Sequence, residues 1–132
     1  MPWQLKIFSK TLKKKEKLKL IREILPPLDG KQCLDLGCSK GTISYFLAKE
    51  GGHWIHEDLD FVNVKTTNDL VKTPTAVISS KGLPHKTHSF DLLVSLDILE
   101  HIEDDQAFLN EMIRVIKPGQ LGPMRRTDLP LT

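Results

Sequence analysis

The stretch CLDLGCSKG, which runs from Cys33 to Gly41, combines residue types that suit a ligand-binding turn. Its first half is apolar enough for a buried strand, and its second half is a short polar loop that begins at Gly37 and closes at Gly41. Glycine has no Cβ, so the backbone of such a loop can approach a ligand closely. A helix that starts after the loop would favour a carboxylate at its N-terminus. The pattern Asp35-x-Gly37-x-x-x-Gly41 therefore predicts a cradle for a small ligand.

The spacing within this loop disfavours two common phosphate-bearing ligands. A P-loop needs its second glycine five positions after the first, but the residue at that distance from Gly37 is Thr42. In a dinucleotide fingerprint counted from Gly37, the second and third glycines would fall on Ser39 and Thr42. Phosphoryl transfer and NAD-dependent oxidoreduction are therefore both disfavoured.

A second acidic residue favours the binding of a nucleoside. Asp58 closes the next apolar stretch, seventeen positions after Gly41. In a doubly wound sheet, an acidic side chain at the end of this strand lies over the ribose of a bound nucleotide. The turn and Asp58 together predict two-point binding of a ligand that contains adenosine.

These residues must be positioned by strands that alternate with helices. Apolar runs predict strands at 32–36, 53–57, 75–79 and 90–96. Helices are predicted at 42–50 and 61–71, and a further helix is capped by Asp104. Such alternation favours parallel pairing with right-handed crossovers. We therefore predict an α/β fold, a Rossmann-like, doubly wound and mostly parallel sheet of order 3-2-1-4 with helices on both faces, whose ligands bind at the carboxyl ends of the strands.

The beginning of the chain differs in charge from the rest. Nine Lys and Arg residues but only three Asp and Glu residues lie within positions 1–32, so a basic arm precedes a mildly acidic body. Apolar residues at helical spacing, beginning with Leu5 and Phe8, predict a basic amphipathic helix within 1–28. The ligand-binding domain is predicted over 29–120 and an irregular tail over 121–132. The basic helix is expected either to cover the sheet or to contact anionic lipid or RNA.

The composition is that of an ordinary soluble globular protein. Hydrophobic residues make up 39% of the chain and charged residues 27%, which indicates neither disorder nor a membrane class. No apolar run has the length of a membrane span or the form of a signal peptide, so a cytoplasmic location is expected. Cys33 and Cys38 lack the spacing of a zinc site or a redox pair. They are expected to be free thiols in a reducing compartment.

Two longer stretches carry a resemblance to a known family. The stretch CLDLGCSKGTISYFLAKEGGHWIHEDLD resembles the nucleoside-binding half of class I S-adenosylmethionine-dependent methyltransferases. The stretch SFDLLVSLDILEHIEDDQAFLNEMIRVIKPGQ resembles their fourth strand and the helix after it, and it is the more specific match. Its Asp97, Leu99, Glu100 and His101 and the closing Lys117-Pro118-Gly119 stand as in the small-molecule and quinone-type branch, methyltransferase type 11. The resemblance covers residues 32–120.

The resemblance implies that S-adenosylmethionine is the cofactor. The residues implied to bind it are Asp35, Gly37, Cys38, Gly41, Asp58, Leu59, Ser79, Leu96 and Asp97. The glycine turn would surround the methionine part of the cofactor, and Asp35 would orient that turn or a water near the amino group. Asp58 would accept hydrogen bonds from both ribose hydroxyls. Leu59 would pack on the adenine ring.

The implied reaction is methyl transfer to a small-molecule acceptor. Leu96 and Asp97 would line the reacting end, and His101 is the candidate general base for acceptors that need one. Because the sulfonium supplies the electrophile, the protein mainly aligns the acceptor with the methyl group and excludes water. Asp97, Glu100 and His101 are interpreted as a helix-capping and packing set rather than as a divalent-metal site.

The chain departs from the family pattern at three places. Ser39 replaces the usual middle glycine of the turn, which is acceptable if its backbone angles are ordinary. Ser79 stands where relatives usually offer an acid to the adenine amino group, so a hydrogen bond accepted by the Ser79 hydroxyl would lack charge assistance. After Lys117-Pro118-Gly119, the sequence LGPMRRTDLPLT has no strand-length apolar run. We interpret this as a C-terminally truncated domain that lacks the usual last strands.

Truncation would leave the strand at 90–96 as an uncovered apolar edge, open to a partner chain. Two functions therefore remain open at the level of the sequence. One is an active small-molecule methyltransferase. The other is a non-catalytic methyltransferase-like domain that binds the nucleoside weakly or acts through a partner chain.

Overall fold

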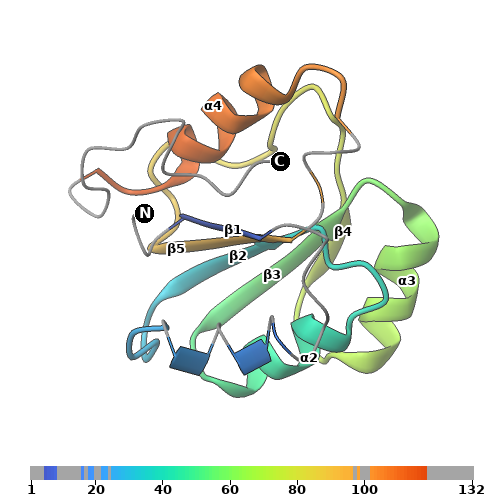
Figure 1. The fold of residues 1–132 in the computed structure, drawn as a ribbon, viewed down its shortest axis with the longest axis vertical. Helices are drawn as coiled ribbons and strands as arrows, with labels where there is room; N and C mark the ends of the chain where they lie inside the picture. Colours follow the sequence, from blue (N-terminus) through green and yellow to red (C-terminus); the bar gives the residue numbers. More distant parts are fainter. Residues whose placement is uncertain are drawn as a thin grey trace.

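The computed structural model is built on one parallel sheet of five strands in the order β1-β5-β2-β3-β4 (Figure 1). It describes residues 5–8, 16, 18–19, 22–23, 25–96, 98 and 102–118. The elements are β1 (Leu5–Phe8), β2 (Gln32–Leu36), α2 (Thr42–Lys49), β3 (His53–Asp58), α3 (Phe61–Leu70), β4 (Thr75–Val77), β5 (Leu92–Leu96) and α4 (Asp105–Val115). The four strands predicted from the sequence have the predicted order, β4-β3-β2-β5, so the fold class is confirmed.

The strand β1 is a correction to the sequence interpretation. A helix was predicted from Leu5 onward, but Leu5–Phe8 form a strand that pairs in parallel with β5, with Leu5 opposite Leu93 and Phe8 opposite Leu96. The uncovered edge predicted for β5 is therefore wrong, because β1 supplies the backbone partners that this edge lacks. Tertiary pairing here outweighs a local helical pattern. Further along, the described residues between 16 and 23 are helical.

Helix α4 covers one face of the sheet, and α2 and α3 lie on the other (Figure 1). The residues of β2 alternate between the two faces, because successive side chains of a strand point to opposite sides. Leu34 and Leu36 pack into the core under α4, whereas Cys33 packs into a smaller core under α2. In β5, Leu92 and Leu93 are fully buried, as expected of a parallel strand covered on both faces.

The helices begin and end where local sequence signals place them. The side chain of Asp60 caps α3 by accepting hydrogen bonds from the N–H groups of Val62 and Asn63. Asp104 caps α4 as predicted, by accepting from the N–H of Ala107.

Two predicted strands are shorter in the structure. Phe90 forms only an isolated bridge ahead of β5, and Ser79 forms another after β4.

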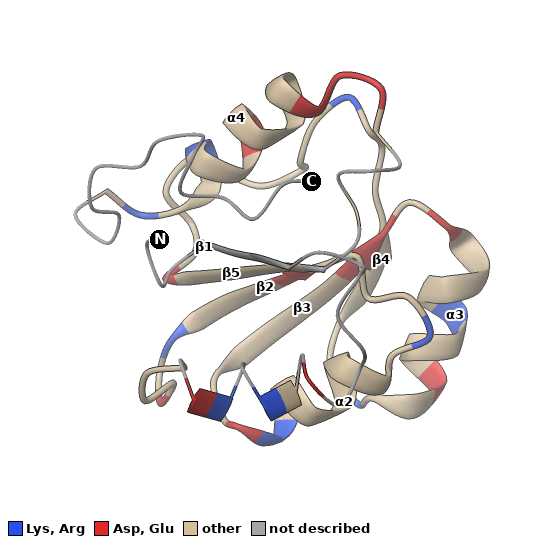
Figure 2. Ribbon diagram, in the orientation of Figure 1, with Lys and Arg blue, Asp and Glu red and all other residues tan. Residues whose placement is uncertain are grey.

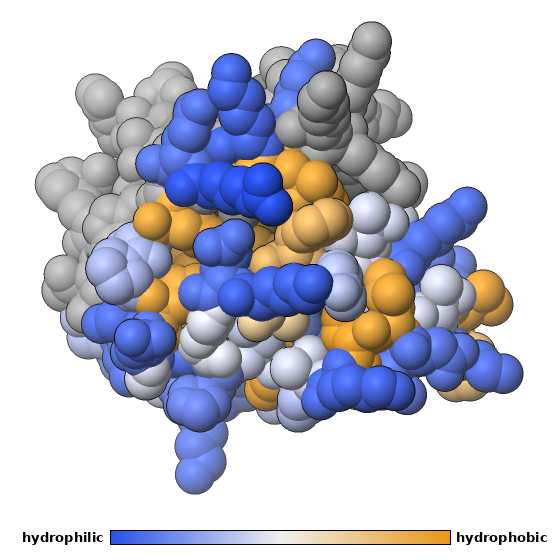
Figure 3. Space-filling view, turned by 90° about the horizontal axis from the view of Figure 1, so that it is seen from below, coloured by the Kyte–Doolittle hydropathy of each residue, from blue (hydrophilic) through white to orange (hydrophobic). Residues whose placement is uncertain are grey.

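The surface on the α2 side mixes hydrophilic residues with separate apolar areas (Figure 3). The large apolar side chains that are exposed within the described residues are Phe61, Val62, Leu70 and Val77. Phe61 is two-thirds exposed at the start of α3. Within the described ranges, no helix has both the length and the apolar character needed to cross a membrane.

Candidate functional site

The turn after β2 is folded back onto the end of β3. The N–H groups of Gly37 and Cys38 both donate to the carbonyl oxygen of Glu57, at 2.7 and 3.1 Å. The N–H of Gly41 donates to the carbonyl oxygen of Cys38 at 2.9 Å and closes the loop on itself. The carboxyl ends of two neighbouring parallel strands therefore share one compact turn, which is the place where ligands bind in sheets of this class.

Gly41 is required for close packing at this turn. Its φ of +89° lies in the left-handed region, and a Cβ at this position would stand 2.9 Å from the Cα of Thr67 in α3. The Thr67 hydroxyl donates to the carbonyl oxygen of Ser39 at 3.1 Å. Helix α3 is thus held against the turn by contacts that any larger residue at position 41 would disrupt.

Ser39 does not have the ordinary backbone angles that the sequence interpretation required. Its φ is 51°, in the left-handed region that glycine occupies without strain. The condition under which the serine was expected to be acceptable is therefore not met. The N–H of Ser39 donates to Oδ2 of Asp58 at 2.9 Å, and this hydrogen bond helps to hold the strained residue in place.

Asp58 stands at the end of β3 with 9% of its surface exposed. Besides the Ser39 N–H, its carboxylate accepts a hydrogen bond from the N–H of Asp60 at 3.0 Å. The side-chain amide of Asn63 lies 3.5 Å from Oδ2. The carboxylate is therefore fixed against the turn by backbone donors from both sides.

Asp35 stands behind the same turn, on the α2 side of the sheet. It is 1% exposed, and its Oδ2 accepts hydrogen bonds from the hydroxyl of Ser44 in the first turn of α2 and from Nδ1 of His56 in β3, at 2.7 Å for the histidine. His56 is itself fully buried, and its ring stacks on Trp54 with centroids 5.9 Å apart. One carboxylate thus ties together the strand before the turn, the helix after it and the neighbouring strand.

Cys38 lies in the same turn and is buried. Burial, opposed by a hydrogen bond with Thr67 and aided by the charges of Asp35 and Asp58, raises the pKa of its thiol to about 12. Cys38 and Cys33 are both free and buried, as the sequence predicted for free thiols. A protonated thiol is a poor nucleophile, so Cys38 lacks the properties of a reactive cysteine. Figure 2 shows acidic residues within β2 and at the carboxyl end of β3, on adjacent strands.

The other predicted site residues are only partly described. Leu59 is half-buried and packs against the larger core, and Ser79 is exposed just beyond β4. The Ser79 hydroxyl accepts a hydrogen bond from the N–H of Lys81 at 3.1 Å. Leu96 ends β5, but its side chain lies outside the described part of the structure, as do Asp97 and His101. The interpretation of Asp97, Glu100 and His101 as a capping set therefore falls on residues that the structure does not describe.

A second acid–histidine pair lies on the α4 face of the sheet. Nε2 of His85, in the loop between β4 and β5, is 2.9 Å from Oε2 of Glu57, which is 1% exposed. Burial raises the pKa of Glu57, and the nearby His85 partly opposes this rise. Oε1 of Glu57 has no hydrogen-bond partner within the described residues.

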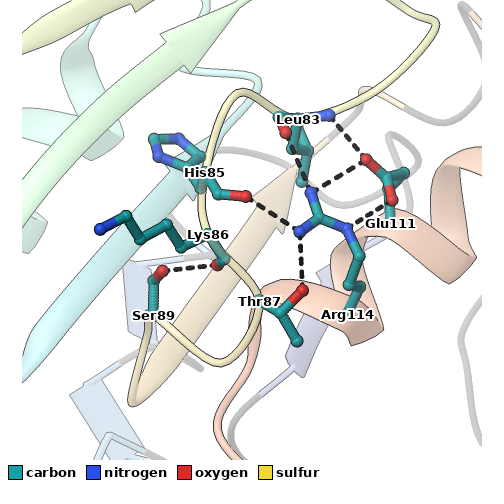
Figure 4. A network of polar contacts seen from close by, with 7 residues as sticks. All are labelled: Leu83, His85, Lys86, Thr87, Ser89, Glu111 and Arg114. Atoms are coloured by element: carbon teal, nitrogen blue, oxygen red, sulfur yellow. Dashed lines mark hydrogen bonds and ion pairs between the residues drawn. The ribbon is translucent and has the colours of Figure 1, made fainter.

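The loop that carries His85 is fastened to α4 by one arginine (Figure 4). The Arg114 guanidinium donates to the carbonyl oxygens of Leu83 and His85 at 3.0 and 2.9 Å, and to the Thr87 hydroxyl at 3.1 Å. It also donates to Glu111, whose carboxylate in turn accepts the N–H of Leu83. The hydrogen bonds from Arg114 hold the pKa of Glu111 below its usual value. These contacts fix the long loop between β4 and β5 against α4.

Sequence reasoning placed the turn and Asp58 correctly at adjacent strand ends, but it missed the residues that support them. Ser44, His56 and Thr67 were not singled out, because their contacts depend on strand register and on the approach of two helices. His56 faces Asp35 only because β2 and β3 pair with these residues opposite each other. The described residues contain no group of three or more His, Cys, Asp and Glu side chains suited to a metal ion.

Comparison with known proteins matches this arrangement to one family. A family model described as a methyltransferase domain matches residues 34–121. The ubiquinone biosynthesis O-methyltransferase of Rhizobium johnstonii is 25% identical over 100 residues, which cover 72% of this chain and 40% of that protein. The norajmaline N-methyltransferase of Rauvolfia serpentina is 28% identical over 108 residues, which cover 71% of this chain and 35% of that protein.

Solved structures share the same fold. The crystal structure of the [4+2]-cyclase SpnF superposes with a TM-score of 0.72 at 20% identity, over 79% of this chain and 41% of that one. The chain thus spans about two fifths of the length of the relatives it matches. Because one of these proteins is named as a cyclase, the fold by itself does not fix the reaction.

Proposed function

The chain belongs to the methyltransferase domain family of class I S-adenosylmethionine-dependent enzymes, and from this premise we propose that it binds S-adenosylmethionine and transfers the methyl group to a small molecule. The observation that carries the proposal is the turn from Gly37 to Gly41, which follows Asp35 and is held to the carboxylate of Asp58 by the Ser39 N–H. A turn with two neighbouring negative charges favours a cationic ligand, and S-adenosylmethionine carries a sulfonium.

The proposed contacts follow from the positions of the described residues. Asp58 accepts the ribose hydroxyls, since a carboxylate has about four lone-pair sites and backbone donors use only part of this capacity. Gly37, Cys38 and Gly41 form the wall around the methionine part. Leu59, which follows Asp58 directly, packs on the adenine ring.

Three further residues complete the proposed cofactor site. The Ser79 hydroxyl, exposed beyond β4, accepts a hydrogen bond from the adenine amino group. Leu96, the last residue of β5, and Asp97, which follows it in the sequence, are proposed to line the side on which the acceptor enters, because β5 is the neighbour of β2, the strand that leads into the turn. Bound S-adenosylmethionine would supply an electrophilic methyl group.

The acceptor is proposed to be a small molecule with a nucleophilic oxygen or nitrogen. This class is suggested by the two relatives, which are named as O- and N-methyltransferases. His101 is the proposed general base for an acceptor whose hydroxyl must lose a proton. The site has the remaining tasks of orienting the acceptor in line with the methyl group and of excluding water.

Calorimetry on the purified chain tests cofactor binding. S-adenosylmethionine and S-adenosylhomocysteine are expected to bind, NAD is not, and Asp58→Ala should weaken binding roughly 30-fold or more, because charge-assisted hydrogen bonds are lost. Asp69→Ala, which removes an exposed acid from α3, is the matched control and should leave binding unchanged. Binding of NAD alone would overturn the proposal.

Turnover needs a separate measurement. Formation of S-adenosylhomocysteine is followed by mass spectrometry while phenols, quinols and amines are supplied as acceptors. Acceptor-dependent product supports the enzyme. Intact cofactor binding with no product from any acceptor would favour the alternative, a domain that binds the nucleoside without catalysis or acts through a partner chain.

A further inference from the structure

Ser39 has a backbone conformation that its side chain disfavours. Its φ is 51°, and within the turn it is the residue other than glycine that lies in the left-handed region. Its N–H donates to Oδ2 of Asp58 at 2.9 Å, and its carbonyl oxygen accepts the hydroxyl of Thr67 at 3.1 Å. For serine, the left-handed conformation costs about as much free energy as one hydrogen bond contributes. Each of these two contacts is therefore large enough to shift the balance between this conformation and an ordinary one.

Thr67 reaches the turn from a fixed position in α3. Its side chain is fully buried, and its Oγ1 would stand 3.0 Å from a Cβ at position 41. A buried hydroxyl needs a hydrogen-bond partner, and a threonine inside a helix often donates back to a carbonyl of its own helix. Here the hydroxyl donates across to Ser39, which lies 28 positions earlier in the sequence. This contact therefore couples the helix to the turn.

The conformation of Ser39 also fixes the spacing of the groups that would face a ligand. The turn leads into α2, whose N-cap is Gly41, and no described side chain caps this helix. The first N–H groups of α2 are therefore open to a carboxylate, such as that of an amino acid. Ser39 joins this end of α2 to Asp58 through its N–H and to α3 through its carbonyl oxygen. If Ser39 left the left-handed conformation, the N-terminus of α2 would move relative to the Asp58 carboxylate.

We propose that Thr67 is a positioning residue, whose hydroxyl holds Ser39 in the left-handed conformation and thereby determines the affinity for the amino-acid part of the ligand. This inference rests on the proposed function and goes beyond it, because none of the proposed cofactor contacts involves Thr67. The two parts of the ligand respond differently. The amino-acid part depends on the shape of the turn, whereas the adenosine part depends on Asp58, which keeps its hydrogen bond from the Asp60 N–H without Thr67.

Calorimetric dissociation constants of S-adenosylhomocysteine and of adenosine, which lacks the amino-acid part, test the proposal. Thr67→Val keeps the shape of the side chain but loses the hydroxyl, so it should weaken S-adenosylhomocysteine binding by roughly three- to tenfold, the worth of about one hydrogen bond. Adenosine binding should stay within about twofold of wild type. Thr67→Ser retains the hydroxyl and should rescue S-adenosylhomocysteine binding. Thr66→Val, at the exposed neighbouring position of α3, is the matched control and should leave both ligands unaffected.

Substitutions of Ser39 test the same inference from the other side of the hydrogen bond. Glycine adopts the left-handed conformation readily, so in a Ser39→Gly background Thr67→Val should weaken S-adenosylhomocysteine binding by less than about twofold. Valine strongly disfavours this conformation, so Ser39→Val should weaken S-adenosylhomocysteine binding more than adenosine binding. Because Ser39 is exposed, this variant decides the question even where thermal unfolding shows that Thr67→Val is not folded.

Three results would each overturn the inference and leave the proposed function standing. They are wild-type S-adenosylhomocysteine affinity in folded Thr67→Val, equal losses for S-adenosylhomocysteine and adenosine in Thr67→Val or Ser39→Val, and an undiminished loss from Thr67→Val in the Ser39→Gly background. Failure of the unaltered chain to bind S-adenosylhomocysteine would overturn the proposed function as well.

Discussion

The two faces of β3 carry two acid–histidine pairs that differ in their surroundings. On the α2 face, Asp35 and His56 are both buried and lie directly behind the glycine turn. On the α4 face, the His85 ring of the Glu57 pair is 15% exposed, and its loop is fastened to a helix by Arg114. The first pair borders the proposed cofactor site, whereas the second belongs to the packing of a loop. The same residue types thus border the proposed site on one face of the sheet and contact a loop on the other, and the face on which the pair lies distinguishes the two.

Gly41→Ala should give the largest effect and should damage the α2 face alone. A Cβ at position 41 would clash with the backbone of Thr67, and the alanine would also have to keep a left-handed φ. We therefore expect a loss of about 3 kcal/mol in the free energy of unfolding. Gly30→Ala, also at positive φ but with open space around it, should cost only about 1 kcal/mol. Urea unfolding of both variants checks this, and equal losses would contradict the packing argument.

Arg114→Met should have the next largest effect, and this effect should be confined to the α4 face. The variant keeps most of the apolar stem but loses the hydrogen bonds to Leu83, His85 and Thr87, so a clearly lower thermal midpoint is expected. Binding of S-adenosylhomocysteine should stay within about twofold of wild type. Lys86→Met in the same loop is the control, since this exposed side chain points away from Arg114 (Figure 4). Loss of ligand binding in Arg114→Met would show that the two faces are coupled.

Glu57→Gln should have a smaller effect, which depends on pH. Because burial raises the pKa of Glu57 above its unfolded value, the folded protein binds more protons, and stability falls as pH rises through the folded pKa. The amide cannot ionise, so it escapes this loss. The melting temperature of Glu57→Gln relative to wild type should therefore be higher near neutral pH than near about pH 4. Thermal unfolding at both pH values measures the difference, and a trend of opposite sign would mean that the His85 contact outweighs burial.

The smallest effect concerns the two cysteine thiols, which are expected to react very slowly with an alkylating reagent. Burial raises the pKa of both Cys33 and Cys38 to about 12, so neither thiol should be alkylated quickly by iodoacetamide at mildly alkaline pH. Mass spectrometry of the folded protein over time checks this, with urea-unfolded protein as the positive control. Rapid modification of Cys38 alone would show that the turn opens.

The sequence was sufficient to predict the parts of the molecule that depend on local signals. The glycine turn and the cap at Asp104 follow from residue spacing within short segments, and the strand order follows from the alternation of strands with helices. The β1 strand was missed because Leu5–Phe8 fits a helical pattern, and only pairing with β5 decides its conformation. The left-handed φ of Ser39 was also missed, since a non-glycine residue there is held by Asp58 from a distant part of the chain.

The contacts of His56 were equally out of reach, because they require the register of β2 against β3 and the approach of α2. The same limit applies to the Glu57 and His85 pair, whose members are 28 positions apart in the sequence. Residue types at strand ends can be predicted from spacing, but the partners behind them depend on tertiary packing.

NMR mapping of S-adenosylhomocysteine onto the chain tests the central claim most directly. The account predicts that saturating ligand shifts the backbone amide signals of Gly37, Cys38, Ser39 and Gly41, together with that of Asp58. The signals of the loop that carries His85, between β4 and β5, should stay in place. Unmoved signals at the glycine turn, or shifts confined to the α4 face around His85, would contradict it.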